Sequence, residues 1–291
     1  MTTATAMRRL ERPRQLERLA ALCRDNAAAL EQAVAYCAAH GIGAFRVNSQ
    51  ILPLKTHPEV GYQMAELPGG AALVESFRRA GRQAAKQGIR LSMHPDQFVV
   101  LNAPNPKVLE SSLAELAYQA EFGAWTGVDV INLHGGGVYG DKSTALERLE
   151  RVVATLPAAI RSRLTLENDD RSFTPSDLLP VCRRTGIPLV YDVHHHRCLP
   201  DALSVEEATA AAVATWGGRE PMFHISSPKE GWQADDPRPH HDFIELNDFP
   251  LCWRALDGTV EVEAKAKEVA VARLSGALLA AGVSLWPKPL K

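Results

Sequence analysis

Histidine and acidic residues recur directly after the short apolar segments of this sequence. His94 follows residues 89–93, and His134 follows residues 128–133. Six of the seven apolar segments end in this way, and eight of the ten histidines lie at or just after such an end. Imidazole and carboxylate groups are ligands for divalent cations such as Zn²⁺ and Mn²⁺, and no closely spaced cysteines compete with them. The pattern therefore predicts a metal site.

Each of these residues has a simpler explanation when it is taken alone. A single histidine such as His94 is more often structural than a ligand, the tract at 194–196 would suit a solvated loop, and Glu263 would suit a charged surface. The prediction rests on the same residue types recurring at successive segment ends. The residues concerned are His94, His134, Glu167, Asp169, Asp192, His194, His195, His196, His224 and Glu263, with His240 and Asp242 in the loop after residues 222–225.

Strand and helix patterns alternate along the chain, which predicts a parallel sheet covered by helices. The predicted strands are residues 43–47, 89–93, 128–133, 164–166, 187–191, 222–225 and 260–262. Seven strands in about 250 residues favour a (β/α)₈ TIM barrel, in which the carboxyl ends of the strands converge on one face. Residues 1–40 look helical, so we predict that the first strand is missing or replaced. We expect a single domain over residues 1–291, with an atypical N-terminal segment at 1–25.

Local signals mark the ends of the predicted helices. Glycines at 41, 88, 127 and 186 directly precede strands, which is typical of a left-handed residue that ends a helix. Thr144 and Ser204 each precede a glutamate by three residues, so both predict a capping box at a helix start. Thr174 and Pro175 predict a further helix start, with proline in the first turn.

Composition limits the class of protein. The 291 residues carry a net charge of −2, so a polyanionic partner would need a local basic patch. Five widely spaced cysteines argue against a secreted disulfide framework. We read no signal peptide or membrane span, and we expect a cytoplasmic protein. The absence of GxSxG, HExxH and GxxxxGK[ST] argues against α/β-hydrolases, zincins and P-loop NTPases.

Seven short stretches between residues 26 and 274 together resemble the UV damage endonuclease family (UvdE/UvsE type). These stretches are RVNS at 46–49, MHPDQF at 93–98, NLHGG at 132–136, LEND at 166–169, YDVHHH at 191–196, HISS at 224–227 and VEAKAKE at 262–268. The resemblance implies a TIM barrel related to endonuclease IV. It also implies an enzyme that nicks double-stranded DNA immediately 5′ of UV photoproducts such as pyrimidine dimers, and in some members of abasic sites.

The resemblance further implies a cluster of two or three divalent metal ions. We expect Mn²⁺, with Zn²⁺ or Mg²⁺ as alternatives. The implied ligands are His94, His134, Glu167, Asp192, His195, His224, His240 and Glu263. Glu167, His94 and Asp192 are expected to act most directly in catalysis, with Glu167 bridging two metals. Spacing alone leaves open whether His241 takes the place of His240.

At two further positions this chain differs from the residues that are typical of the family. The family inserts a Gln–Tyr pair into the duplex at the lesion, and Gln97 and Phe98 stand at that position here. Phenylalanine keeps the apolar wedge and its stacking face but lacks the hydroxyl. Many members also have a modified lysine two residues before the histidine that matches His224, and this chain has Met222 there.

Two other functions remain open at this stage. A xylose-isomerase-like sugar isomerase or epimerase would also gather histidines and carboxylates at strand ends. The Gln97–Phe98 pair disfavours that alternative, since a sugar enzyme has no use for a duplex wedge. The second alternative is a catalytically silent protein that binds damaged DNA, which Met222 and the missing strand would suit. For the enzyme we expect a monomer.

Overall fold

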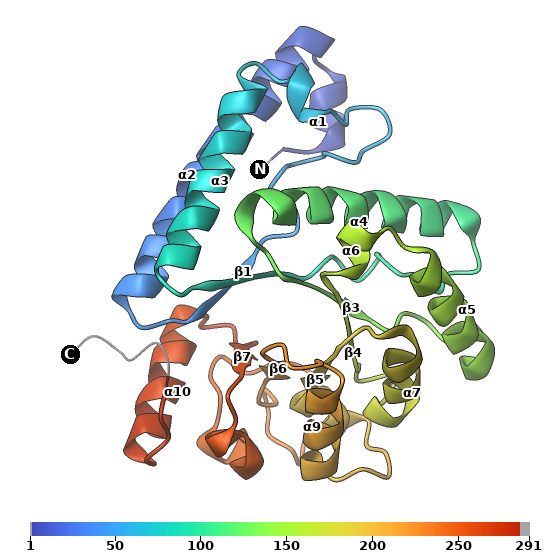
Figure 1. The fold of residues 1–291 in the computed structure, drawn as a ribbon, viewed down its shortest axis with the longest axis vertical. Coiled ribbons are helices and arrows are strands. Elements are labelled where there is room, and N and C mark those ends of the chain that lie inside the picture. The colour runs from blue at the N-terminus through green and yellow to red at the C-terminus, as the bar shows by residue number, and fades with distance from the viewer. Residues whose placement is uncertain (1, 286–291) are drawn as a thin grey trace. The chain divides into compact units, whose positions relative to one another are not determined.

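The computed structural model describes residues 2–285 of the chain (Figure 1). The chain divides into two compact units. Within the described residues, the first unit is formed by 2–99, Glu110–Ile131 and Ala158–Arg163, and the second by Val100–Leu109, Asn132–Pro157 and 164–285. The single domain that we expect over residues 1–291 stays a prediction.

The first unit is built mainly of long helices and two complete strands. Helices α2 and α3 lie side by side, and β1 and β2 pair in parallel with Val47 opposite Met93. Strand β3 continues this pairing, with Ile131 opposite Met93. The elements are α1 (Ala4–Arg8), α2 (Arg12–Ala39), β1 (Ala44–Val47), η1 (Met64–Glu66), α3 (Gly70–Lys86), β2 (Arg90–Met93), most of α4 (Pro106–Thr126), the start of β3 (Val130–His134) and α6 (Ala158–Arg161).

The second unit alternates short strands with helices. Its elements are the end of β3, α5 (Lys142–Thr155), β4 (Leu164–Glu167), α7 (Pro175–Thr185), β5 (Leu189–Asp192), α8 (Val193–Cys198), α9 (Val205–Ala214), β6 (Met222–Ile225), η2 (Leu246–Asp248), η3 (Leu251–Ala255), β7 (Thr259–Val262) and α10 (Glu268–Ala280). Every residue of β4, β5 and β6 is buried, as expected for parallel strands that are covered on both faces.

The strands follow one another in the order of a TIM barrel. Residues 2–285 contain one sheet with the order β1-β2-β3-β4-β5-β6-β7, and its registered pairs are parallel. Consecutive strands are neighbours, which is the arrangement of a (β/α)₈ barrel with one strand fewer. All seven predicted strands are confirmed, with ends shifted by at most two residues. In residues 2–43 the structure has helices α1 and α2 and no strand, as predicted.

Most of the predicted helix ends are also confirmed. Gly41, Gly88, Gly127 and Gly186 have φ values of 67°, 68°, 82° and 73°, so all four adopt the left-handed conformation that glycine accepts without strain. No helix in residues 2–285 is both long and apolar enough to cross a membrane.

One of the predicted helix starts is wrong. Ser204 and Thr174 cap α9 and α7 through the predicted hydrogen bonds, and Pro175 opens α7. Thr144, however, lies inside α5, because the carboxylate of Asp141 caps the helix by accepting a hydrogen bond from the Thr144 N–H at 2.7 Å. Aspartate is as good a cap as threonine, and it starts the helix three residues earlier.

We expect the packing of α3 in the first unit to tolerate no side chain at Gly81. A β-carbon at this position would lie 2.3 Å from the backbone oxygen of Thr126 at the end of α4. Overpacking of this kind costs about 1–3 kcal/mol. The variant Gly81→Ala should therefore lower the free energy of unfolding and the Tm, measured by urea and thermal denaturation.

Gly276 in α10 provides the matched control, since an added β-carbon there has no heavy atom within 4 Å. Alanine favours the helix over glycine by roughly 0.5–1 kcal/mol, so Gly276→Ala should raise the Tm. Equal melting temperatures for the two variants would contradict the close approach of α3 and α4.

Candidate metal centre

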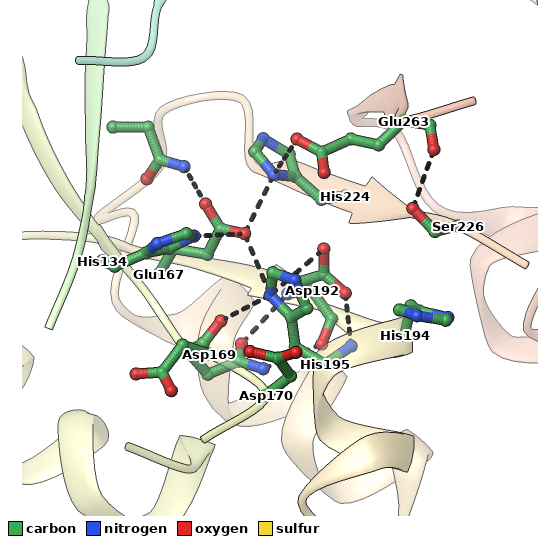
Figure 2. A network of polar contacts seen from close by, with 12 residues as sticks. His134, Glu167, Asp169, Asp170, Asp192, His194, His195, His224, Ser226 and Glu263 are labelled. Carbon is green, nitrogen blue, oxygen red and sulfur yellow. Dashed lines mark hydrogen bonds and ion pairs between the residues drawn. The ribbon is translucent and has the colours of Figure 1, made fainter. Parts of the chain in front are cut away.

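A buried carboxylate lies at the centre of a histidine cluster in the second unit (Figure 2). Glu167, the last residue of β4, has no solvent-exposed surface. Its Oε1 atom lies 3.1 Å from Nδ1 of His224, 3.3 Å from Nδ1 of His195 and 3.5 Å from Nε2 of His134. Three imidazoles from β6, α8 and β3 therefore converge on one oxygen atom.

The second oxygen of this carboxylate is held by an asparagine. Asn132 in β3 donates a hydrogen bond from its amide to Oε2 of Glu167. The amide oxygen of Asn132 in turn accepts a hydrogen bond from the Thr165 hydroxyl at 2.8 Å. This fixed amide orients the Glu167 carboxylate, so that Oε1 faces the imidazoles.

Asp192 serves both the cluster and the helix that follows it. It ends β5 and caps α8, because Oδ1 accepts a hydrogen bond from the backbone N–H of His195 at 2.7 Å. Its other oxygen, Oδ2, is buried 3.5 Å from Nδ1 of His195 and accepts no hydrogen bond within residues 2–285. The amide of Asn168 clamps the Asp192 backbone, donating to the carbonyl at 2.8 Å and accepting from the N–H at 3.0 Å. The strand end is thus rigidly placed.

A second carboxylate approaches His224 from the loop after β7. Oε1 of Glu263 lies 3.4 Å from Nδ1 of His224. Oε2 of Glu263 lies 3.8 Å from Nδ1 of His240, which is also 3.2 Å from the hydroxyl of Ser226. The neighbouring His241 instead accepts a hydrogen bond from the backbone N–H of Phe243 at 3.0 Å. The geometry therefore brings His240, and not His241, next to Glu263.

The ionisation of the cluster reflects its burial. Burial alone would raise the pKa of Glu167, but the imidazoles of His224 and His134 hold it well below its usual value. Burial would lower the pKa of His195 and His224, and the nearby carboxylates raise both well above the usual value. Burial raises the pKa of Asp192. Carboxylates and imidazoles thus each favour the charged form of the other, and bound cations would favour the ionised carboxylates in the same way.

The donor atoms fit divalent metal ions. One atom each from Glu167, Asp192 and His195 lie within 4.8 Å of one another, and the same holds for Asp192, His224 and Glu263. Asp192 belongs to both groups, and its buried Oδ2 has no hydrogen bond to compete with a metal. Carboxylate oxygen and imidazole nitrogen suit Zn²⁺ and Mn²⁺. The residues present therefore match the metal site that the sequence predicts.

The predicted lesion-contacting pair lies in the first unit, at the tip of a tight turn after β2. The N–H of Val99 donates to the carbonyl of Asp96 at 2.8 Å, which places Gln97 and Phe98 at the two central positions. The Phe98 residue is 78% exposed. His94 lies just before this turn, and its Nδ1 is 3.2 Å from Nη1 of Arg46.

Other polar residues near the strand ends have structural roles. The carboxylate of Asp169 accepts hydrogen bonds from the N–H groups of Arg171 and Phe173 at 2.8 and 3.1 Å, which closes the loop after β4. His194 lies 3.1 Å from the Arg238 carbonyl through its Nε2 atom. His196 has the Tyr191 hydroxyl 2.7 Å from its Nδ1. The 194–196 tract is a buried part of α8, so the solvated loop weighed as an alternative is wrong.

Three residues that support the cluster were not singled out from the sequence. Asn132 and Asn168 flank strand ends, and asparagine gives no metal signal of its own. Glu261 lies in β7, with Oε2 3.2 Å from Nε2 of His224. Its spacing of two residues from Glu263 could have revealed it, because alternate residues of a strand share a side.

Comparisons with known proteins give a consistent result. The family model for the UV-endonuclease UvdE matches residues 1–283. A UV DNA damage endonuclease of Bacillus velezensis is 32% identical over an alignment 297 residues long, which covers 96% of this chain and 90% of the relative. One of Bacillus pumilus is 33% identical over 250 residues, with coverage of 82% and 76%.

Two solved structures extend the comparison. The crystal structure of SacUVDE matches with a TM-score of 0.84 and 27% identity, over 98% of this chain and 93% of that one. Endonuclease IV from Thermus thermophilus matches with a TM-score of 0.63 and 20% identity, over 87% and 94%. At 20% identity, the similarity to endonuclease IV is evidence for the fold alone, and it confirms the predicted TIM-barrel class.

The segment after α8 contains an acidic residue with a perturbed pKa. Asp201 accepts hydrogen bonds from the N–H groups of Ser176 and Leu203, each at 2.8 Å, and lies 3.0 Å from Nε2 of His196. Burial would raise the pKa of Asp201, but these hydrogen bonds lower it to about 2.

We therefore expect Asp201→Asn to destabilise the fold in a pH-dependent way. The ionised Asp201 stabilises the native state at neutral pH, and this contribution disappears as the pH falls from about 4 toward 2. Loss of hydrogen bonds to a charged group costs about 2 kcal/mol at pH 7. Urea denaturation at several pH values measures this, and a difference from wild type that stays constant below pH 4 would contradict it.

Proposed function

Because this chain belongs to the UV DNA damage endonuclease family, and is therefore a DNA repair endonuclease, we propose that it nicks DNA immediately 5′ of UV photoproducts with divalent metal ions. The observation that carries the metal dependence is the fully buried Glu167 carboxylate, with three imidazole nitrogens within 3.5 Å of one of its oxygens. A buried anion of this kind needs a cationic partner.

The proposed metal ligands are the eight residues that the resemblance to the family implies. Six of them meet in the second unit, and His240 lies beside one of the six, Glu263. His94 lies in the first unit, and its proposed role as a ligand rests on the resemblance of the sequence to the family. Mn²⁺ is the expected metal, and Zn²⁺ and Mg²⁺ are alternatives. The ligands from the second unit are His134, Glu167, Asp192, His195, His224, His240 and Glu263.

The proposed reaction adds one water molecule across a P–O3′ bond. The water oxygen bonds to phosphorus, the P–O3′ bond breaks, and the products carry a 3′-hydroxyl and a 5′-phosphate. Divalent metal ions bound in the cluster would activate the water and stabilise the departing oxygen. The chain itself holds its carboxylates in place: Asn132 orients Glu167, and Asn168 fixes the end of β5 at Asp192. Such preorganisation avoids reorganising the site during the reaction.

Recognition of damage is proposed to rest on Gln97 and Phe98. Unstacking a base step costs a few kcal/mol and costs least where the base is already damaged. An exposed aromatic ring at the tip of a turn can fill the space that an unstacked base leaves. We expect the substrate to be double-stranded DNA with UV lesions, with abasic sites as a further substrate. The protein is proposed to act as a cytoplasmic monomer.

The alternative functions gain no specific support. A D-psicose 3-epimerase from Clostridium cellulolyticum matches with a TM-score of 0.56 and 14% identity, which concerns the fold alone. A silent binder of damaged DNA would bind irradiated DNA without cutting it. A nicking assay with Mn²⁺, run beside a binding assay on the same irradiated DNA, separates these alternatives.

The central test replaces Glu167 by glutamine. Glu167→Gln keeps the shape of the side chain but removes the charge that the cluster is built around, so nicking of UV-irradiated plasmid with Mn²⁺ should fall by at least about a hundredfold, in line with the loss of an electrostatic group in a catalytic site. Circular dichroism should show an intact fold. Glu206→Gln, on the exposed first turn of α9, is the matched control and should nick like wild type. Wild-type nicking by Glu167→Gln would sink the proposal.

A second test removes the ring of Phe98. Because this side chain is exposed, Phe98→Ala should leave the Tm unchanged while it lowers the preference for irradiated over undamaged plasmid by about tenfold, the equivalent of roughly 1.4 kcal/mol of lost stacking. Leu251→Ala removes another exposed apolar side chain, 71% exposed, and should keep the preference. An unchanged preference in Phe98→Ala would exclude the wedge role.

A further inference from the structure

A buried acidic residue faces the side of His224 that is turned away from Glu167. Oε2 of Glu261 lies 3.2 Å from Nε2 of His224, while Nδ1 of the same ring lies 3.1 Å from Glu167 and 3.4 Å from Glu263. His224 has no exposed surface, and Glu261 is only 8% exposed. The two ring nitrogens of one buried imidazole therefore face two different sets of carboxylates.

The sheet register creates this pairing. Strands β6 and β7 pair in parallel, and the residue opposite His224 is Glu261. Met222 lies two residues before His224 on the same side of β6, is fully buried and has no ionisable group. The carboxylate beside Nε2 of His224 therefore comes from Glu261 on the neighbouring strand, β7. Glu263 follows two residues later, so β7 and the residue after it present one carboxylate to each nitrogen of the ring.

The two nitrogens of a neutral imidazole cannot have the same role. One carries the hydrogen atom, and the other offers a lone pair. A nitrogen that binds a metal ion must offer its lone pair, and its partner nitrogen then donates a hydrogen bond, often to a carboxylate. Glu261 can only accept when it is ionised, so the hydrogen atom belongs on Nε2, and the lone pair belongs on Nδ1.

We propose that Glu261 is a positioning residue of the metal centre, which accepts the Nε2–H of His224 and so directs the Nδ1 lone pair at the metal held with Asp192 and Glu263. Glu261 thus acts through His224 and is not itself a ligand. It also places negative charge behind the ring, which makes Nδ1 a stronger donor to a cation. This inference rests on the metal site proposed above.

The experiment compares three variants of the full-length protein. Glu261→Leu removes the acceptor at similar size, and Glu261→Gln keeps an amide oxygen that accepts the same hydrogen bond. Asp201→Asn is the matched control, because it disturbs another buried carboxylate–histidine pair, at His196, outside the proposed ligand set. Mn²⁺ affinity is measured by calorimetry. In Zn²⁺-loaded, ¹⁵N-labelled protein, long-range ¹H–¹⁵N spectra report which nitrogen of each histidine carries hydrogen.

The proposal predicts a graded loss of metal affinity. Removing a partner that orients a ligand typically costs 10–100-fold in affinity, so Glu261→Leu should weaken Mn²⁺ binding by about that factor. Glu261→Gln should lose less than about tenfold, because it still accepts the hydrogen bond. Asp201→Asn should lower the Tm but keep the wild-type Kd. The slowly exchanging Nε2–H signal of His224 should persist in wild type and Glu261→Gln and vanish in Glu261→Leu.

Different results would overturn different claims. If wild type binds Mn²⁺ and Glu261→Leu binds it equally well, or if Asp201→Asn weakens binding as much, the positioning role of Glu261 is wrong and the proposed function stands. A His224 ring that carries its hydrogen on Nδ1 in the Zn²⁺-loaded protein would likewise overturn this inference alone. A wild-type protein that binds no divalent metal would overturn the inference and the proposed function together.

Discussion

The candidate metal centre depends on how the second unit holds the charge of Glu167 away from water. An ionised carboxylate in a protein interior is stable only when positive charge and hydrogen bonds replace its lost hydration. Here three imidazoles face one oxygen atom, and an asparagine amide holds the other. These partners come from β3, β6 and α8, so the strand ends must meet for the charge to be tolerated. The same demand for positive charge makes the cluster suitable for divalent cations.

Much of this arrangement can be predicted from the sequence because it follows from strand direction. In a parallel barrel-type sheet all carboxyl ends share one face, so residues far apart in sequence, such as His134 and His224, meet because each lies near the carboxyl end of its strand. The strands were recognisable because glycines such as Gly186 end the preceding helices. The resemblance to UV damage endonucleases added the choice among the candidates, which spacing alone left open at His240.

The parts that escaped prediction depend on side-chain packing. Asn132 and Asn168 are neutral amides, and only their positions against Glu167 and Asp192 show what they do. Glu261 resembles one more surface charge in the Glu-x-Glu-x-Lys run at 261–265 until the register places it opposite His224. The start of α5 was missed because Asp141 and Thr144 are both acceptable caps, and local sequence does not decide between them.

The two oxygens of Asp192 restrict which side chain can replace it. One oxygen opens helix α8, and the other is turned to the cluster, so a single side chain serves secondary structure and chemistry at once. Asparagine would preserve the helix start but bring a neutral amide to the cluster, and glutamate would keep the charge but extend the reach by one methylene. Neither replacement keeps both roles, so the side chain at this position is restricted to aspartate by its length as well as by its charge.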